Sequence, residues 1–192
     1  MKLKSFLATL TLLFGLASCV PRQHPNPGQQ PSTPVQGGPF MLGIDVLESQ
    51  GFQLLAGRRV GLITNHTSYN SRGVRTRSVL QRARNVNLVA LYAPEHGIEG
   101  TAPAGKYIAT RRDSITGLTV HSLYGVTRKP SPAQLAGIDM MVFEMQDIGV
   151  RSYTYISTMV RAMEACGERG IPFVVLDRPN PMGGQGVFGP PL

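Results

Sequence analysis

The stretch "VNLVALYAPEHG", Val86 to Gly97, joins a continuous apolar run to a polar sequence that begins directly after Pro94. A short, unbroken apolar run rich in Val and Leu is typical of a strand buried on both faces of a parallel sheet. Glu95 and His96 follow at the point where this strand would end. Parallel sheets present their ligand groups beyond the carboxyl ends of their strands, so these two residues are candidates for a functional site.

Three further runs share this apolar character and are predicted strands. They are "RRVGLITN" (Arg58 to Asn65), "IDMMVFEMQD" (Ile138 to Asp147) and "IPFVVLDRP" (Ile171 to Pro179), with "LTVHSLYG" (Leu118 to Gly125) as a weaker candidate. Helical patterns lie near residues 43–55, 72–84, 131–136 and 153–169. Strands that alternate with helices indicate βαβ units, so we expect an α/β fold with a mostly parallel sheet.

Each of the four strong strands runs directly into polar residues. These groups are Asn65-His66-Thr67, Glu95-His96-Gly97, Glu144 to Gly149, and Asp177 to Asn180. In an open doubly wound sheet the ligand crevice lies outside the carboxyl ends of the strands. We therefore expect the four strands to lie parallel in one sheet, with Glu95, Asp147 and Asp177 facing a shared crevice.

The segment after the first strand argues against classical nucleotide cofactors. "NHTSYNSRG" (Asn65 to Gly73) matches neither a dinucleotide fingerprint nor a Walker loop, so no cofactor is expected. A metal site could be assembled from His66, Glu95, His96, Asp147 and Asp177. None of these has the spacing of a known ligand motif, and no metal is expected. The sequence also lacks a GxSxG nucleophile motif.

The strand-end carboxylates fit glycoside hydrolysis, which needs a proton donor for the leaving oxygen and usually a second carboxylate. Glu95 could serve as the general acid if partial burial and neighbouring charge tune its pKa. An equally simple interpretation is that Glu95 caps the following segment by accepting hydrogen bonds from backbone amides. Asp147 and Asp177 are each followed by an arginine, Arg151 or Arg178, and structural Asp–Arg pairing is the stronger interpretation for them.

Two tyrosines stand at the head of the last predicted helix. Tyr153 and Tyr155 follow the third strong strand. Aromatic faces near a crevice suit sugar rings, and the hydroxyl groups can bind polar substituents. Core packing is an equally ordinary role for at least one of them.

The N-terminus has the pattern of an export signal. Lys2 and Lys4 precede a compact apolar run, Phe6 to Leu16, which is too short to span a bilayer comfortably. Leu16 to Cys19 resembles a bacterial lipobox, in which cleavage leaves a lipid-bearing Cys19 at the new N-terminus. We expect residues 1–18 to be a lipoprotein signal peptide, and the protein to be exported and anchored in a membrane, facing the periplasm or the cell exterior. An ordinary signal peptide that contains a cysteine is the alternative.

Residues 19–40 are rich in Pro, Gln, Gly and Ser and nearly free of large apolar side chains. Such a segment cannot bury enough apolar surface to offset its ordering entropy, so we expect a disordered tether. The folded domain is then residues 41–192. With Cys19 lipidated, Cys166 has no disulfide partner and is expected to be a buried free thiol.

The formal net charge is +8, and five arginines crowd around one predicted helix. They are Arg72, Arg75, Arg77, Arg82 and Arg84. No interleaved aromatic residues or nucleic-acid motif accompany them, so nucleic acid is not expected as a partner. Anionic partners, such as lipid head groups or a cell-wall polymer that bears carboxylates, are more plausible.

Four ordered motifs resemble those of one family. "YAPEHGIEGTAPAG", "GLTVHSLYG", "FEMQDIGVRSYTYISTM" and "VLDRPNPMGG" are similar to the NamZ-type exo-β-N-acetylmuramidases, and the resemblance runs from about Gly43 to Leu192. It implies a Rossmann-like, doubly wound N-terminal domain, with the pocket between this domain and a smaller C-terminal one. It also implies an activity in peptidoglycan recycling, the release of terminal N-acetylmuramic acid from the non-reducing ends of muropeptide or peptidoglycan fragments.

The resemblance also assigns site residues. The family's Pro-Glu-His-Gly motif falls on Pro94 to Gly97, which makes Glu95 the candidate catalytic acid and His96 its neighbour in the pocket. Either Arg151 or Arg178 could bind the lactyl carboxylate of muramic acid, since a guanidinium fork suits that group. The remaining predicted substrate-binding residues are Asn65, Gln146, Asp147, Tyr153, Asp177 and Asn180.

Three features depart from the family pattern. Glu144 stands where Asp is expected before the Gln-Asp pair, and Phe188 stands where Glu is expected before a late Gly-Pro. The sequence ends at Leu192, so we expect a truncated N-terminal domain without the second domain. Two hypotheses follow: an enzyme whose remaining half lies outside this sequence, or a non-catalytic lipoprotein that binds muropeptides.

Overall fold

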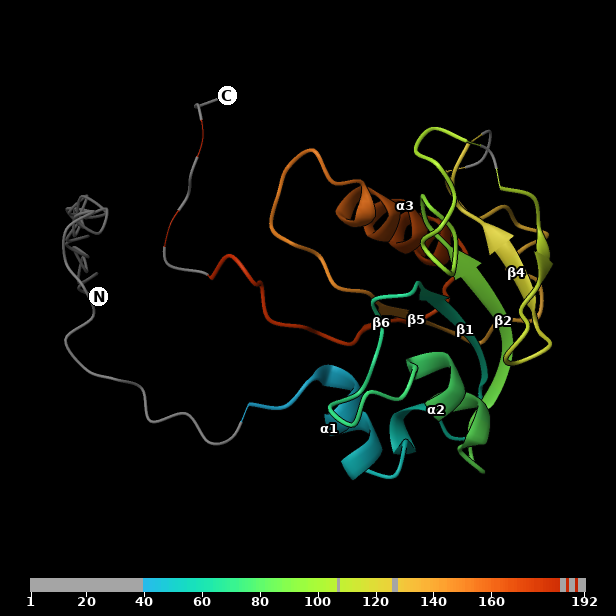
Figure 1. Cartoon of the computed structure of the whole chain (residues 1–192). Helices are drawn as coiled ribbons and strands as arrows, with labels where there is room; N and C mark the ends of the chain where they lie inside the picture. Colours follow the sequence, from blue (N-terminus) through green and yellow to red (C-terminus); the bar gives the residue numbers. More distant parts are fainter. Residues whose placement is uncertain (1–39, 107, 126–127, 184–185, 187–188, 190–192) are drawn as a thin grey trace, which may run out of the picture. The chain divides into compact units, whose positions relative to one another are not determined.

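The computed structural model describes residues 40–106, 108–125, 128–183, 186 and 189. These residues form a β-sheet with helices on both faces (Figure 1). The predictions for the signal peptide, for Cys19 and for Phe188 lie outside the described residues, as does the expected tether up to residue 39.

The sheet has six strands in the order β3-β4-β2-β1-β5-β6. Their bounds are β1 Arg59–Thr64, β2 Asn87–Ala93, β3 Arg111–Arg112, β4 Thr119–Ser122, β5 Met140–Glu144 and β6 Phe173–Val175. All neighbouring strands pair in parallel except β3, which pairs antiparallel with β4. The predicted α/β fold with a mostly parallel sheet is therefore confirmed.

The central strand β1 is buried from Val60 to Thr64. Gly61 allows side chains of both neighbouring strands to approach it, because a Cβ atom there would stand 2.9 Å from Tyr92 and 3.1 Å from Met141. Strand β5 is buried throughout. Helices cover both faces of these strands, which explains why their sequences are apolar without alternation.

The helices form two layers, one on each face of the sheet (Figure 1). Helix α1 (Gly43–Ser49), the 3-10 helix η1 (Gln53–Leu55) and α2 (Thr76–Arg82) pack in one core cluster. Helix α3 (Tyr155–Gly167) packs in the other. Alternate residues of β5 divide between the clusters, Val142 to the first and Met141 to the second. Cys166 on α3 is a buried free thiol, as predicted.

The chain winds in two directions from the centre of the sheet. It leaves β1 through α2 to β2 on one side, and leaves β5 through α3 to β6 on the other. Because β1 and β5 are neighbours, the two connections diverge at their carboxyl ends. Open α/β sheets bind ligands at such a switch point. The residues there are Asn65 to Ser68 after β1 and Met145 to Asp147 after β5.

Two predicted helices differ from the structure. The helix expected at 43–55 ends at Ser49, because Gly51 and Phe52 adopt left-handed conformations with φ of 61° and 56°. The helix expected at 131–136 is wrong, since this segment forms a turn that is followed by Gly137 with a φ of 81°. In the first segment the left-handed residues interrupt the helical hydrogen-bond ladder. In the second segment one helical bond forms, from the Leu135 N–H to the Ser131 carbonyl oxygen, before Gly137 turns the chain.

Several boundaries also differ, and one strand is not predicted. Helix α2 begins at Thr76 rather than at residue 72, because Tyr69 and Arg75 form an isolated antiparallel bridge before it. Strand β6 is shorter than predicted and ends at Val175. The sequence pattern does not predict the two-residue strand β3 at all.

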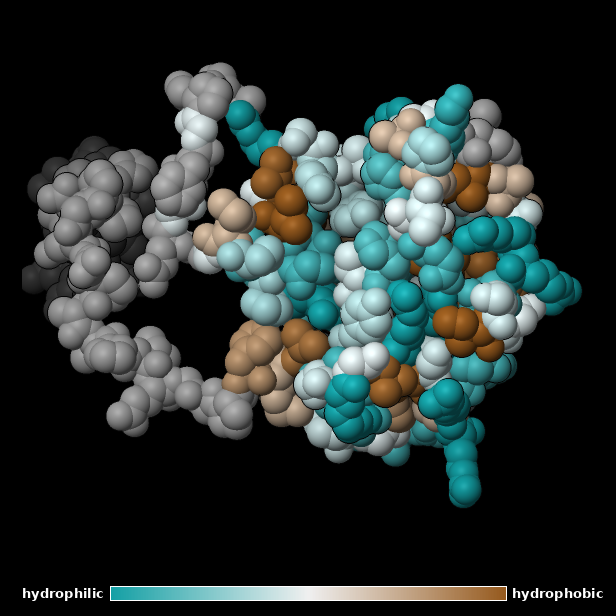
Figure 2. All heavy atoms as spheres, in the orientation of Figure 1, coloured by the Kyte–Doolittle hydropathy of each residue, from teal (hydrophilic) through white to brown (hydrophobic). Residues whose placement is uncertain are grey.

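Among the described residues, no helix is both long and apolar enough to cross a membrane. The surface in view carries hydrophobic side chains in separate patches between polar ones (Figure 2).

Candidate functional site

Hydrogen bonds join the loops that follow β1 and β5 across the switch point. The Gln146 backbone N–H donates to Thr67 Oγ1 at 3.0 Å. The Ser68 hydroxyl donates to the Glu144 carbonyl oxygen at 2.6 Å. Asn65 Oδ1 accepts hydrogen bonds from the backbone N–H and the hydroxyl of Thr67, at 2.8 and 2.6 Å. These bonds hold together the two loops that form the base of the candidate site.

Glu95 follows β2 at the same edge and is hydrogen-bonded on both carboxylate oxygens. Oε1 accepts from the Gly105 N–H at 3.2 Å, and Oε2 accepts from the Thr154 hydroxyl at 3.1 Å. Burial raises the pKa of Glu95, but hydrogen bonds from Tyr124 and these two groups, together with nearby His96, lower it below its ordinary value. Glu95 is therefore ionised at neutral pH, whereas a resting general acid has a raised pKa.

The three residues that hydrogen-bond to Glu95 are absent from the sequence-based prediction. A signal existed for Tyr124, because it lies at the end of the weaker predicted strand. Ala93 of β2 pairs with Ser122 of β4, so Glu95 and Tyr124 each lie two residues beyond a paired position. Thr154 directly precedes α3, and Gly105 is reached only because the loop after β2 folds back.

His96 occupies a left-handed conformation with a φ of 67°, which non-glycine residues seldom adopt. Its Nδ1 lies 2.8 Å from the Ala102 carbonyl oxygen, and the Ala102 N–H donates to the His96 carbonyl oxygen at 3.2 Å. Because a carbonyl oxygen only accepts hydrogen bonds, Nδ1 of His96 carries the hydrogen. Unusual backbone conformations of this kind are frequent at functional sites.

A buried arginine anchors the loop that carries Glu95 and His96. The Arg77 side chain is 1% exposed and forms ion pairs with Glu99 and, at 3.5 Å, with Asp113. Glu99 belongs to the loop after β2, and Asp113 follows β3. Arg77 therefore has an internal structural role and does not belong to a basic surface.

Tyr155 lies close to both carboxylates at this edge. It is 6% exposed, and its hydroxyl lies near Asn65, Glu95 and Asp147. Burial raises the pKa of Tyr155, the amide of Asn65 opposes the rise, and the negative charges of Glu95 and Asp147 add to it. Tyr153 packs edge-on against Tyr155 with a distance of 6.0 Å between ring centroids. Tyr155 is thus within electrostatic reach of Glu95 and Asp147 and within hydrogen-bonding reach of Asn65.

Several buried polar atoms at this edge form no hydrogen bond of ordinary geometry with other described residues. They include Asn65 Nδ2, His66 Nδ1 and Asp147 Oδ2. Buried polar atoms are normally bonded, and an unpaired one costs about 1–3 kcal/mol.

Arg178 is tied to several groups around the switch point. Its Nη1 pairs with Glu144 and donates to the Tyr69 carbonyl oxygen at 2.8 Å. Its Nε donates to Gln146 Oε1 at 3.1 Å. Burial raises the pKa of Glu144, and the charge of Arg178 opposes the rise. The structural pairing expected between Arg178 and Asp177 is thus made with Glu144 instead, and binding of a lactyl carboxylate by Arg178 stays a prediction.

The remaining predicted residues lie at the rim. Asp177 is exposed, and its Oδ1 accepts the Arg178 N–H at 2.9 Å. Asn180 packs against Gly149, and a side chain at position 149 would collide with it. Arg151 and Tyr153 are exposed. Among the described residues, no hydrogen bond or ion pair joins Asp177 to Glu95, so their shared crevice stays a prediction.

A hollow of about 150 Å³ adjoins Glu95 and is lined by its partners Tyr124 and Thr154, with Arg128 and Arg161. This volume is below the roughly 300–1,000 Å³ typical of small-molecule sites. Within the described ranges, no three His, Cys, Asp or Glu side chains are placed to hold a metal ion.

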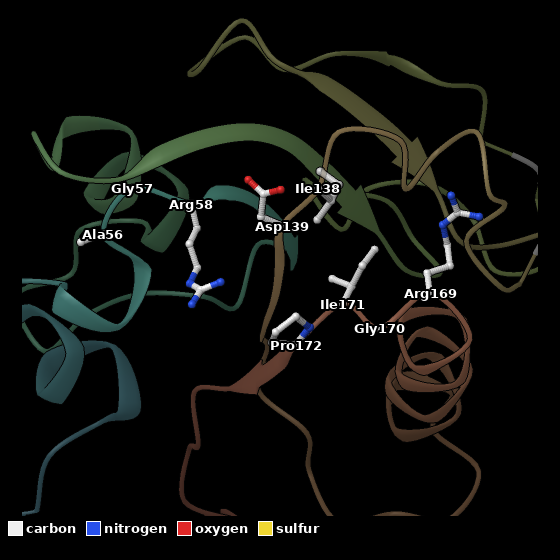
Figure 3. A pocket seen from close by; sticks show the side chains of 9 residues that line it. All are labelled: Ala56, Gly57, Arg58, Ile138, Asp139, Arg169, Gly170, Ile171 and Pro172. Atoms are coloured by element: carbon white, nitrogen blue, oxygen red, sulfur yellow. The ribbon is translucent and has the colours of Figure 1, made fainter.

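A larger groove of about 590 Å³ lies at the opposite edge of the sheet, where β5 and β6 begin (Figure 3). Its lining includes Arg58, Asp139 and Arg169, whose side chains are spread along it. Asp139 is already paired with Arg59, at 2.8 Å. None of the predicted site residues lines this groove, so we place the candidate site at the carboxyl edge.

Comparison with known proteins shows the family of this chain. Residues 60–192 match the family model described as exo-β-N-acetylmuramidase NamZ, N-terminal. Over 191 residues the chain is 41% identical to peptidoglycan β-N-acetylmuramidase NamZ of Bacillus subtilis (strain 168). The aligned region covers 98% of this chain and 45% of that protein.

Two crystal structures of DUF1343 family proteins from Bacteroides fragilis NCTC 9343 are also similar. One is 55% identical with a TM-score of 0.69, and the aligned region covers 75% of this chain and 36% of that protein's chain. The other is 34% identical with a TM-score of 0.60, and the aligned region covers 73% of this chain and 35% of that protein's chain. The chain thus spans less than half the length of these relatives. Since the family model matches most of the sequence, including the Pro94 to Gly97 motif, the chain belongs to the NamZ exo-β-N-acetylmuramidase N-terminal family.

Proposed function

We propose that this chain forms the Rossmann-like wall of an exo-β-N-acetylmuramidase that releases terminal N-acetylmuramic acid from the non-reducing ends of muropeptide or glycan fragments in peptidoglycan recycling. The observation that carries the proposal is Glu95, a partly buried carboxylate oriented by hydrogen bonds from Gly105, Thr154 and Tyr124. Its motif lies within the family match. The relative in Bacillus subtilis is named as a peptidoglycan β-N-acetylmuramidase.

In this proposal Glu95 is the catalytic acid and acquires its proton only when a sugar covers it. The hydrogen bonds keep Glu95 ionised in the ligand-free protein, although burial is the largest single influence on its pKa and acts upward. A bound sugar excludes water and increases this burial, which raises the pKa toward the range that a general acid needs. Asp147, with a buried and unpaired Oδ2, is the candidate second carboxylate.

The lactyl carboxylate of muramic acid calls for a cation at the rim. The guanidinium of Arg178 is already engaged by Glu144, Gln146 and the Tyr69 carbonyl, which limits its freedom to turn toward a ligand. Arg151 lies on the exposed loop between β5 and α3, four residues after Asp147. Arg151 and Arg178 are both candidates for the lactyl partner.

The test uses a fusion of family length, in which this chain continues into the unmatched C-terminal part of the 55% identical Bacteroides fragilis protein. Release of N-acetylmuramic acid from a chromogenic muramoside is measured. Glu95→Gln keeps the shape of the side chain but cannot donate the proton, so the rate should fall by a factor of about 10² to 10⁴. The control is Glu164→Gln on the exposed side of α3, which should leave the rate unchanged.

Two outcomes would change the proposal. Substantial turnover by Glu95→Gln would return Glu95 to the role of a cap at the end of its strand. No turnover by the unaltered fusion, combined with muropeptide binding by the 192-residue chain, would favour the alternative of a non-catalytic muropeptide-binding lipoprotein.

We further propose that the mature protein is an exported lipoprotein, held on a membrane through a lipid on Cys19. The support is the lipobox-like sequence from Leu16 to Cys19 at the end of a short apolar run. Cys19→Ala should move the protein from the membrane fraction to the soluble exported fraction. Intact-mass measurement of an unmodified N-terminus would contradict the lipid anchor.

A further inference from the structure

Helix α3 has an exposed apolar stripe in addition to the face that packs on the sheet. The stripe consists of Ile156, Val160 and Met163, which are 48%, 45% and 44% exposed. With 3.6 residues per turn, these positions fall within a sector of roughly 60°. The sheet-facing side holds Tyr155, Thr158, Ala162, Ala165 and Cys166, all buried.

The stripe extends the buried face around one side of the helix, where the partly buried Met159 lies between Cys166 and Met163. The centres of the stripe and of the buried face lie roughly 140° apart around the helix, counted from the same helical period. The polar residues Ser157, Arg161 and Glu164 occupy the other side. A helix at the surface of a small domain normally exposes polar residues away from its buried face, so apolar side chains this far from the sheet indicate a further packing partner.

Strand β6 beside this helix is also open. It is the last strand on its side of the sheet and pairs with β5. Val175, at the end of β6, is 45% exposed. An edge strand presents unpaired backbone groups along its free side and readily accepts another strand.

The opposite face of the sheet carries apolar surface at the same edge. A groove of about 360 Å³ between α1 and β6 is lined by Phe40, Met41, Val46 and Leu54. These side chains are 69%, 46%, 37% and 51% exposed. In Figure 2 hydrophobic surface is visible beside the beginning of the described chain. Both helix layers are thus apolar next to the free edge of β6.

We propose that the β6 edge, with the α3 stripe and the α1 groove, is the docking surface for the further polypeptide of a family-length chain, which adds a strand to β6 and covers both flanks. Each relative has more than half of its length outside the part matched here, so family chains contain a segment able to fill this surface. An α/β sheet that continued past β6 would have one more strand beside β6 and apolar helices covering both faces of that strand. The exposed surface has the shape and apolar character that such an addition would cover.

The test measures thiol accessibility and needs no catalytic activity. Val160→Cys and Met163→Cys are placed separately in a Cys19→Ser background, both in the 192-residue chain and in the fusion to the unmatched part of the Bacteroides fragilis protein with its own cysteines replaced. Both thiols should label readily in the short chain and at least tenfold more slowly in the fusion. The control is Gln81→Cys on α2, which is exposed and should label equally in both forms.

Buried Cys166 reports whether the α3 layer is folded, because its thiol stays unreactive only while that layer is packed. Equal labelling of Val160→Cys in the two forms, with Cys166 protected in both, would overturn the proposal. Protection that appears in the short chain alone and grows with its concentration would also overturn it, since a second copy would then be the occupant. Val160→Glu should leave the short chain as stable as before and restore rapid labelling of Met163→Cys in the fusion.

Discussion

Replacing Arg178 with alanine should unfold the protein more readily, before any question of ligand binding arises. The Arg178 side chain is 12% exposed and its partner Glu144 is fully buried. Without Arg178, a buried carboxylate loses its cation, and the Tyr69 carbonyl and the Gln146 amide each lose a donor. Removing one partner of a buried pair typically costs about 3–5 kcal/mol in the free energy of unfolding. For a domain of this size that corresponds to a fall of about 10 °C in the melting temperature.

The assay is urea unfolding followed by circular dichroism, with Arg59→Ala as the control. Arg59 and Asp139 form a bidentate pair whose side chains are 53% and 37% exposed, so its loss should have a much smaller effect. The double variant Arg178→Met with Glu144→Gln should recover much of the stability, because no uncompensated charge is then buried.

The loss in the free energy of unfolding caused by Arg178→Ala should also depend on pH. Burial raises the pKa of Glu144, and Arg178 is the charge that opposes this rise. In the variant the folded-state pKa of Glu144 therefore lies further above its unfolded value. Stability linked to such a group is present below the unfolded pKa and is lost as pH rises through the folded one. The loss in the free energy of unfolding should thus be small at pH ~4 and largest at pH ~7. A loss under about 1 kcal/mol at neutral pH, or a loss independent of pH, would refute this reasoning.

Two further predictions concern the loops of the candidate site. Gly100 and Gly57 share a φ of 69°, but a Cβ atom at Gly100 would collide with the His66 ring, whereas a Cβ atom at Gly57 would meet no atom within 4 Å. In urea unfolding, Gly100→Ala should therefore lower the free energy of unfolding by about 1–3 kcal/mol more than Gly57→Ala. Equal losses would contradict the packing on His66. Thr154→Val removes a donor to Glu95, so carboxyl NMR should show the pKa of Glu95 moving up toward its ordinary value. Because a lowered pKa contributes stability that is lost as pH falls through it, this variant should also lose less stability on acidification, and an unchanged Glu95 titration would count against the hydrogen bond.

The sheet could be predicted from the sequence because its strands are buried on both faces. Residues such as Leu62 and Val142 have no solvent-facing side, so their runs are continuously apolar and end abruptly at polar residues. The position of Glu95 at the carboxyl edge of the sheet follows from the same pattern. The elements that the pattern misses are short or depend on distant contacts, as with β3, whose two residues exist as a strand only through pairing with β4.

The electrostatic state of Glu95 could not be predicted in the same way. Its partner Thr154 lies 59 positions away in the sequence, and Gly105 reaches it only through the fold of a loop. The sequence suggests a carboxyl whose pKa could be tuned, but the direction depends on donors that the tertiary structure supplies. The ion pair of Arg178 with Glu144 also joins two strand ends that no local pattern relates.

The hydrogen bond from His96 to Ala102 determines which ring nitrogen can exchange a proton. Since Nδ1 holds its hydrogen against the Ala102 carbonyl, the neutral ring is the tautomer with a free lone pair on Nε2. In that form His96 can accept a hydrogen bond from a sugar hydroxyl but cannot donate one to a glycosidic oxygen. The left-handed backbone holds the ring in this arrangement, so the motif places a hydrogen-bond acceptor and a carboxylate side by side. The electropositive hydroxyl hydrogens of a carbohydrate suit such a pair.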